Sequence, residues 1–192
     1  MGVLPTGKVG LLAAPGGTGK TFALTALAFS IALGRPWFGN GANTSWLNCP
    51  RRGRVVLLLG EDDTHDVQRR ILTQARALGL CDSDRAGVNA QLLALGGQGQ
   101  RFQLLCGEKE NYAEHPVASG LYELLRQEAL ERGPFRAILL DPLSRFSPPE
   151  AETDNHAATR LVEVLERFAG SAELGRPLVM ASHHTRKGNG EG

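Results

Sequence analysis

Apolar residues occur along this chain in short continuous runs, separated by longer stretches in which apolar and polar residues mix. Each run is bounded on at least one side by glycine, proline or a charged residue, as is typical of a β-strand. A strand that is apolar along its whole length is buried on both faces, which indicates a parallel sheet. We therefore expect strands at residues 9–14, 54–60, 91–95, 135–141 and 177–182.

The stretches between these runs are long enough to hold helices. We expect helices at residues 21–33, 65–78, 117–132 and 155–170. The second follows Glu61-Asp62-Asp63-Thr64, whose acidic and hydroxyl side chains are typical of a helix N-terminus. Strands that alternate with helices predict a three-layer α/β fold, in which helices cover both faces of a mainly parallel central sheet.

Two segments do not fit this alternation. Residues 35–53 are rich in Gly, Pro and Asn and contain Trp37 and Trp46. We interpret them as an excursion between helix and strand in which the tryptophans anchor a local subdomain, the alternative being an interface or base-stacking role. Residues 96–116 predict a long loop, with a possible short strand at 102–106.

Length and composition fit a single domain that spans residues 1–192. With 42% hydrophobic residues, the chain can bury a core of ordinary size. Lys and Arg number 21 against 20 Asp and Glu, a net charge of +1. This balance excludes a global basic field, so any contact with nucleic acid must be local.

The cysteines and the N-terminal sequence indicate a cytoplasmic protein that does not enter a membrane. Cys49, Cys81 and Cys106 lie far apart and form no CxxC pair, which argues against a disulfide framework or a structural zinc site and fits a reducing compartment. The first residues do not resemble a signal peptide. No apolar run approaches the ~20 residues that a membrane-spanning helix needs.

The residues after the first predicted strand match the pattern Gly/Ala-x-x-x-x-Gly-Lys-Ser/Thr of a phosphate-binding P-loop. They are Ala14, Pro15, Gly16, Gly17, Thr18, Gly19, Lys20 and Thr21. Glycines let backbone N–H groups turn inward and cradle phosphate oxygens at a helix N-terminus. We expect Lys20 to reach the β- and γ-phosphates of ATP and the Thr21 hydroxyl to ligate Mg²⁺. The strand before the motif and the helix after it disfavour the alternative, a Gly-rich turn that binds no nucleotide.

Two carboxylates at strand ends complete a predicted hydrolytic site. Asp141 ends a buried strand that we expect to neighbour the P-loop strand, where its carboxylate can hold Mg²⁺. The alternative for Asp141 is a turn cap before Pro142. Glu61 follows another strand, expected beside the P-loop strand, where it can orient and deprotonate the water that attacks the γ-phosphate. The alternative for Glu61 is a helix-capping acid.

Together these motifs resemble the RecA-fold ATPases, and among them most closely the hexameric RepA-type replicative helicases of plasmids and phages. The resemblance spans residues 9–188 and rests on four segments in this order: Ala14 to Thr21, Val55 to Asp63, Ala137 to Phe146 and His183 to Gly188. It implies a RecA-like core that binds ATP and Mg²⁺ and hydrolyses ATP. It also implies a homohexameric ring that holds single-stranded DNA in its channel.

The same resemblance implies roles for individual residues. It repeats the roles given above to the P-loop and to the two carboxylates. Arg70, nine residues after Glu61, matches an arginine that packs on the adenine ring, a use that suits a flat guanidinium. His184, at the end of the last predicted strand, matches a residue that senses the γ-phosphate and passes its presence to a DNA-binding loop that follows.

Two further expectations concern what the resemblance leaves out. In RecA-fold proteins the sheet continues, and a later arginine finger completes the active site of the neighbouring subunit. The sequence stops at Gly192, so we expect a core that is incomplete at its C-terminus and little motor activity from this chain alone. An ATP-gated regulatory or interaction protein remains an alternative, which the near-zero net charge fits. A small-molecule kinase would need a cluster of lid arginines, and residues 142–155 supply no evident one.

Overall fold

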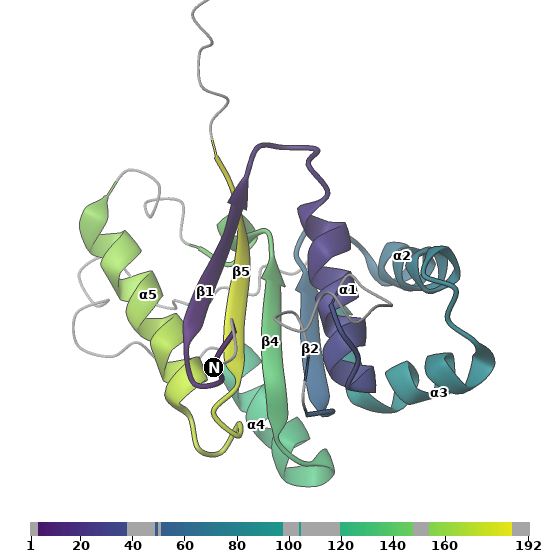
Figure 1. Cartoon of the computed structure of the whole chain (residues 1–192). Coiled ribbons are helices and arrows are strands. Elements are labelled where there is room, and N and C mark those ends of the chain that lie inside the picture. The colour runs from purple at the N-terminus through teal and green to yellow at the C-terminus, as the bar shows by residue number, and fades with distance from the viewer. Residues whose placement is uncertain are drawn as a thin grey trace, which may run out of the picture.

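A single parallel sheet forms the centre of the molecule (Figure 1). The computed structural model describes residues 4–37, 49, 51–97, 104, 120–147 and 154–185. Within these residues the sheet has five strands in the order β1-β5-β4-β2-β3, and every pair is parallel. The strands are β1 (Val9–Ala14), β2 (Arg54–Leu59), β3 (Leu92–Gly96), β4 (Phe135–Asp141) and β5 (Leu178–His184). Their carboxyl ends therefore lie along one edge of the sheet, at the top of Figure 1.

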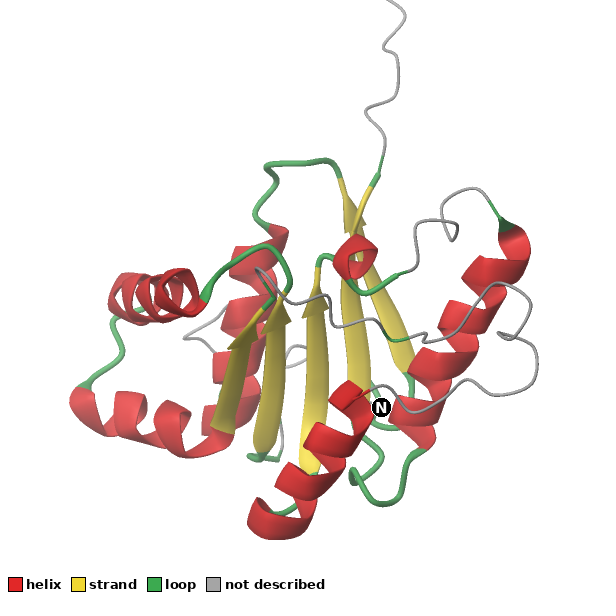
Figure 2. Ribbon diagram, turned by 180° about the vertical axis from the view of Figure 1, so that it is seen from behind, coloured by secondary structure: helices red, strands yellow, loops and turns green. Residues whose placement is uncertain are grey.

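Helices cover both faces of this sheet. They are α1 (Lys20–Leu33), α2 (Thr64–Ala77), α3 (Asp82–Gln91), α4 (Gly120–Arg132) and α5 (Asn155–Gly170), with a short 3-10 turn η2 (Leu143–Arg145). Helix α1 packs on one face, and α4 and α5 lie on the other, as the view from behind shows (Figure 2). None of the helices in the described ranges is long and apolar enough to cross a membrane. The arrangement confirms the predicted α/β fold with RecA-like layers.

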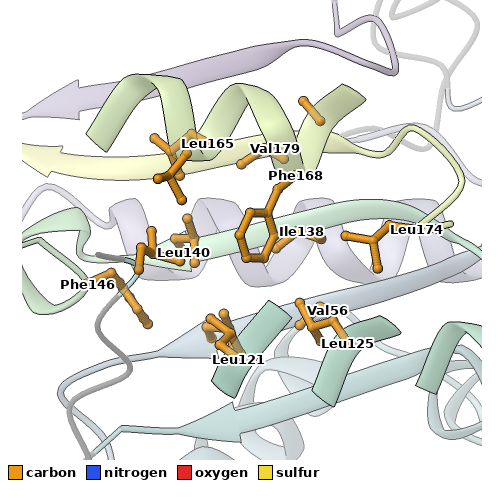
Figure 3. Close-up of a cluster of buried hydrophobic side chains, with 14 of the residues drawn as sticks. Val56, Leu121, Leu125, Ile138, Leu140, Phe146, Leu165, Phe168, Leu174 and Val179 are labelled. Carbon is orange, nitrogen blue, oxygen red and sulfur yellow. The ribbon is translucent and has the colours of Figure 1, made fainter. Parts of the chain in front are cut away.

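The core explains why the strands are apolar at every position. On β2, Val56 and Leu58 face the cluster beneath α4 and α5, whereas Val55 and Leu57 face the cluster beneath α1. Figure 3 shows the first of these clusters, with Phe168 of α5 among the strand side chains. Because successive side chains of a strand point to opposite faces, two buried faces require apolar residues of both parities.

The predicted elements match the observed ones within two residues at the described ends. Residues 117–119, where the third predicted helix begins, lie outside the described residues, and that helix is described from Gly120. Helix α3 is not predicted. Only Asp84 and Val88 of α3 are buried, so its sequence shows no apolar stripe of helical period.

The order of strands in the sheet corrects one expectation. The sequence predicts the strands of Asp141 and Glu61 beside β1, but β5 lies there, followed by β4 and then β2. The prediction is wrong because similar apolar runs do not show which strand inserts between two others, a choice that depends on how the connecting helices pack. With β5 between them, β1 and β4 lie about 10 Å apart, since neighbouring strands are spaced ~4.8 Å.

The excursion at residues 35–53 is described only in part. Trp37 packs against the cluster beneath α1, and its indole nitrogen Nε1 donates to the carbonyl of Ala23 at 3.1 Å. This position fits the anchoring role predicted for Trp37. Trp46 lies outside the described residues.

The loop predicted at residues 96–116 is described at Gly96, Gly97 and Leu104. Leu104 is buried, and its backbone N–H donates to the carbonyl of Phe146 at 3.2 Å. The rest of the possible strand at 102–106 lies outside the described residues, so that prediction stays open.

Candidate functional site

The P-loop joins β1 to α1 through two glycines in the left-handed region. Gly17 has φ 76° and Gly19 has φ 85°, values that glycine adopts without strain. A Cβ at either position would meet no atom within 4 Å, so backbone conformation and not space requires glycine here. Gly19 is the N-cap of α1, and no described side chain caps this helix. The helix N-terminus therefore keeps its N–H groups and the positive end of its dipole for an anion.

Lys20 is buried inside this loop, with 6% of the residue exposed. Its ammonium donates to the carbonyl of Ala14 at 2.7 Å and to the carbonyl of Pro15 at 2.7 Å. A buried ammonium needs such acceptors, and phosphate oxygens can replace them. Thr21, the next residue, is half-buried in the first turn of α1. The loop therefore has the conformation, the cation and the hydroxyl that phosphate binding requires.

His184 lies against the P-loop. Strands β1 and β5 pair so that Ala14 stands opposite His184. The His184 Nδ1 atom is 3.4 Å from the Lys20 ammonium and accepts from it when Nδ1 carries no proton. A Cβ added at Gly16 would lie 3.7 Å from the same Nδ1 atom. The fold thus joins two predicted site residues that are 164 positions apart in the sequence.

Asp141 ends β4 and is buried beside β5. Leu140 pairs with Ala181 in the register of these strands, so Asp141 and Ser182 follow as neighbours. The Ser182 hydroxyl donates to the Asp141 Oδ1 atom, and both residues are buried. The hydrogen bond fixes one carboxylate oxygen and thereby orients the other.

Glu61 stands two residues beyond the end of β2. Strands β2 and β4 are joined at this end because the Gly60 N–H donates to the Asp141 carbonyl at 2.8 Å. The Glu61 Oε1 atom accepts from Nε and Nη2 of Arg145, at 3.3 and 3.2 Å. Both side chains are half-exposed, so the pair faces solvent at the edge of the sheet. Glu61 does not cap α2, because the Asp63 side chain accepts from the Asp66 N–H at the start of that helix.

Arg70 reaches the same edge from α2. Its guanidinium donates to both carboxylate oxygens of Asp62, at 2.7 and 2.9 Å. The hydrogen bond to Asp62 raises the pKa of Arg70 above its ordinary value, and the negative charges of Asp62 and Asp141 act in the same direction. The guanidinium is therefore held near the strand-end carboxylates. Its contact with an adenine ring stays a prediction.

The predicted residues lie along the carboxyl edge in the order of the strands. The P-loop follows β1, His184 ends β5, Asp141 ends β4 and Glu61 follows β2. The described residues contain no group of three or more His, Cys, Asp or Glu side chains that could hold a metal ion by themselves. Mg²⁺ at nucleotide sites uses one or two carboxylates together with substrate phosphates and water, so a hydroxyl from Thr21 and a carboxylate from Asp141 fit it.

Three residues of this edge have no role in the sequence analysis. Ser182 is the polar residue that ends the apolar run of β5, and this position is a signal that could have identified it. Arg145 stands four residues after Asp141 and Asp62 follows Glu61, but sequence proximity does not show which charges meet. The ion pair of Arg145 with Glu61 and that of Asp62 with Arg70 depend on the tertiary structure.

Comparison with known protein families agrees with this geometry. Residues 1–190 match the family described as AAA domain. No curated protein matches the chain significantly. The match covers nearly the whole chain and includes the P-loop and the strand-end carboxylates. The chain therefore belongs to the AAA domain family of P-loop ATPases.

Proposed function

We propose that this ATPase domain is part of a DNA helicase of the hexameric RepA type, which acts on single-stranded DNA during plasmid or phage replication. The observation that supports the proposal most directly is the contact between Lys20 and His184. In the proposed mechanism, a change at the phosphate site moves the end of β5 through this contact. The chain continues from there into Arg186 and Lys187, which lie outside the described residues and supply the local positive charge that DNA requires.

The proposed hydrolysis assigns one step to each side chain. Lys20 leaves the carbonyls of Ala14 and Pro15 and donates to the β- and γ-phosphates. Mg²⁺, held through Thr21 and Asp141, neutralises phosphate charge when it is bound.

Glu61 then positions a water molecule and accepts its proton. The water oxygen forms a bond to the γ-phosphorus while the bond from that phosphorus to the bridging oxygen breaks. The electron pair stays on ADP, so the products are ADP and inorganic phosphate.

His184 provides the proposed coupling between ATP and DNA. When Lys20 turns to phosphate, the imidazole loses its lysine contact and can donate an N–H to a γ-phosphate oxygen instead. A strand end that follows the imidazole would shift the chain beyond Thr185. In the proposed ring, that segment of each subunit lines the channel and contacts the DNA backbone.

An ATP-gated regulator is the second candidate, and the net charge of +1 is the observation that favours it. Such a protein binds ATP and changes shape without acting on DNA. ATP hydrolysis measured with and without single-stranded DNA separates the two candidates. We expect single-stranded DNA to raise the turnover rate, and an unchanged rate would favour the regulator.

The control variant is Glu61→Gln, in which an amide of the same shape cannot accept the proton. We expect it to bind Mg·ATP normally and to hydrolyse it about 10²–10⁴ times more slowly, with or without DNA. Undiminished hydrolysis by this variant would show that Glu61 is not the base.

A further inference from the structure

We propose that Arg145 is a positioning residue for Glu61, which it holds by one oxygen so that the other faces the attacking water. The inference rests on the proposed role of Glu61 as the base. Nε and Nη2 of Arg145 both donate to Oε1 of Glu61, at 3.3 and 3.2 Å. A carboxylate restrained at one oxygen keeps lone pairs on the other for a water proton.

Gly60 allows Arg145 to cross the end of β2. A Cβ added at Gly60 would lie 2.5 Å from the Cβ and 3.0 Å from the Cγ of Arg145. It would also lie 3.3 Å from Cε2 of Phe146. Approaches under 3.0 Å do not occur between real carbon atoms of this kind, so only glycine admits the arginine stem here. The close approach places the guanidinium beside Glu61, the next residue along the chain.

The turn that supplies Arg145 is well anchored. Phe146 is 1% exposed within the core cluster shown in Figure 3, and its carbonyl accepts from the Leu104 N–H. Within the turn, the Arg145 N–H donates to the carbonyl of Pro142 at 3.1 Å, and the Ser147 hydroxyl donates to the carbonyl of Leu143 at 2.7 Å. An anchored backbone limits the positions that the arginine side chain can reach, as a positioning role requires.

The exposure of the pair indicates orientation as its role and not stability. The side chains of Arg145 and Glu61 are 56% and 54% exposed, and ion pairs in such surroundings stabilise a fold little. The turn of Arg145 begins two residues after Asp141, so the carboxylate proposed for Mg²⁺ and the group that orients the base lie on one short segment. Arg145 thereby links the two halves of the proposed hydrolytic site.

Single-turnover hydrolysis, with protein in excess over ATP, tests the inference even where turnover is slow. We expect Arg145→Ala to slow hydrolysis by about two- to fivefold, the range that loss of an exposed ion pair can account for. Its affinity for Mg·ADP should remain unchanged, because Arg145 acts on Glu61 and not on the nucleotide. Arg145→Lys should recover part of the rate through one donor. Gly60→Ala should slow hydrolysis in the same way, because the added methyl group displaces the arginine stem.

Two controls separate this inference from the proposed function. Arg126→Ala removes a half-buried arginine whose partner is Glu123 on α4, and its rate should equal that of the unaltered protein. Arg145→Ala added to Glu61→Gln should cause no further loss. A full additional loss in that double variant, an unchanged rate in Arg145→Ala, or weaker Mg·ADP binding by Arg145→Ala would each overturn the positioning role. Persistent hydrolysis by Glu61→Gln alone would instead overturn the proposed base.

Discussion

At the amino edge of the sheet, the Arg54 guanidinium donates to the carbonyls of Glu128 and Gly133 and to the Glu128 carboxylate. Its Cζ atom also lies 4.7 Å from the centre of the Phe135 ring. At the carboxyl edge, the guanidinium of Arg145 has Glu61 as its only hydrogen-bond partner among the described residues. The Arg54 side chain is 11% exposed and that of Arg145 is 56% exposed. The arginine of the amino edge thus fastens elements together, whereas the arginine of the carboxyl edge holds an exposed carboxylate of the proposed site.

The difference shows how one sheet separates stability from chemistry. Buried charges such as Arg54 must be fully paired. A fully paired group loses much free energy when it exchanges its partners. The exposed charges after β2 and β4 contribute little to folding, so they remain available to a ligand. Lys20 is an exception at the carboxyl edge, since it is buried yet paired only with loop carbonyls and His184 among the described residues.

Of three variants at the two edges, we expect the largest effect from Lys20→Ala. The variant loses the ammonium that would leave its two carbonyl partners and bind phosphate oxygens. The free energy of ATP binding should therefore weaken by about 3 kcal/mol or more, which is over a hundredfold in affinity. Equilibrium titration with Mg·ATP measures the change. Lys8→Ala, an exposed lysine just before the other end of β1, is the matched control and should bind ATP normally. Unchanged affinity in Lys20→Ala would contradict the assignment of the P-loop.

A smaller effect, on folding and not on binding, is expected from Arg54→Met. Removal of the guanidinium leaves two partly buried carbonyls and the Glu128 carboxylate without this donor, so the free energy of unfolding should fall by about 2–4 kcal/mol. Urea denaturation measures this loss. Arg132→Met is the control, because Arg132 lies 3.8 Å from the same carboxylate but is 68% exposed, and it should lose less than about 0.5 kcal/mol. Equal losses in the two variants would show that burial does not distinguish the pairs.

The smallest of the three effects is expected from Ser182→Ala. Without the serine hydroxyl, Asp141 loses the donor that orients it, and Mg²⁺ should contribute about 1–2 kcal/mol less to ATP binding. ATP titrations with Mg²⁺ and with a chelator measure that contribution, and the chelator value should not change. Ser30→Ala removes a buried hydroxyl at the far end of α1 and should leave both values intact. A normal Mg²⁺ contribution in Ser182→Ala would separate Asp141 from the metal.

Sequence patterns identified candidate residues for the site but not how they are arranged. Lys20 and Thr21 follow from a motif whose glycines have a local conformational reason, seen here as positive φ at Gly17 and Gly19. Helix α3 was missed because too few of its residues are buried. Ser182 and Arg145 were given no role, since a hydrogen bond or an ion pair between distant residues leaves no local pattern.

The sequence by itself determined the α/β alternation, the bounds of the strands and the P-loop, because burial on both faces and the turning of a glycine loop each require particular residues locally. The tertiary structure alone decided that β5 lies between β1 and β4. That order sets His184 against Lys20 and Ser182 against Asp141, and both contacts join segments far apart in the chain. It depends on how the helices pack on the two faces of the sheet, which no single run of residues specifies.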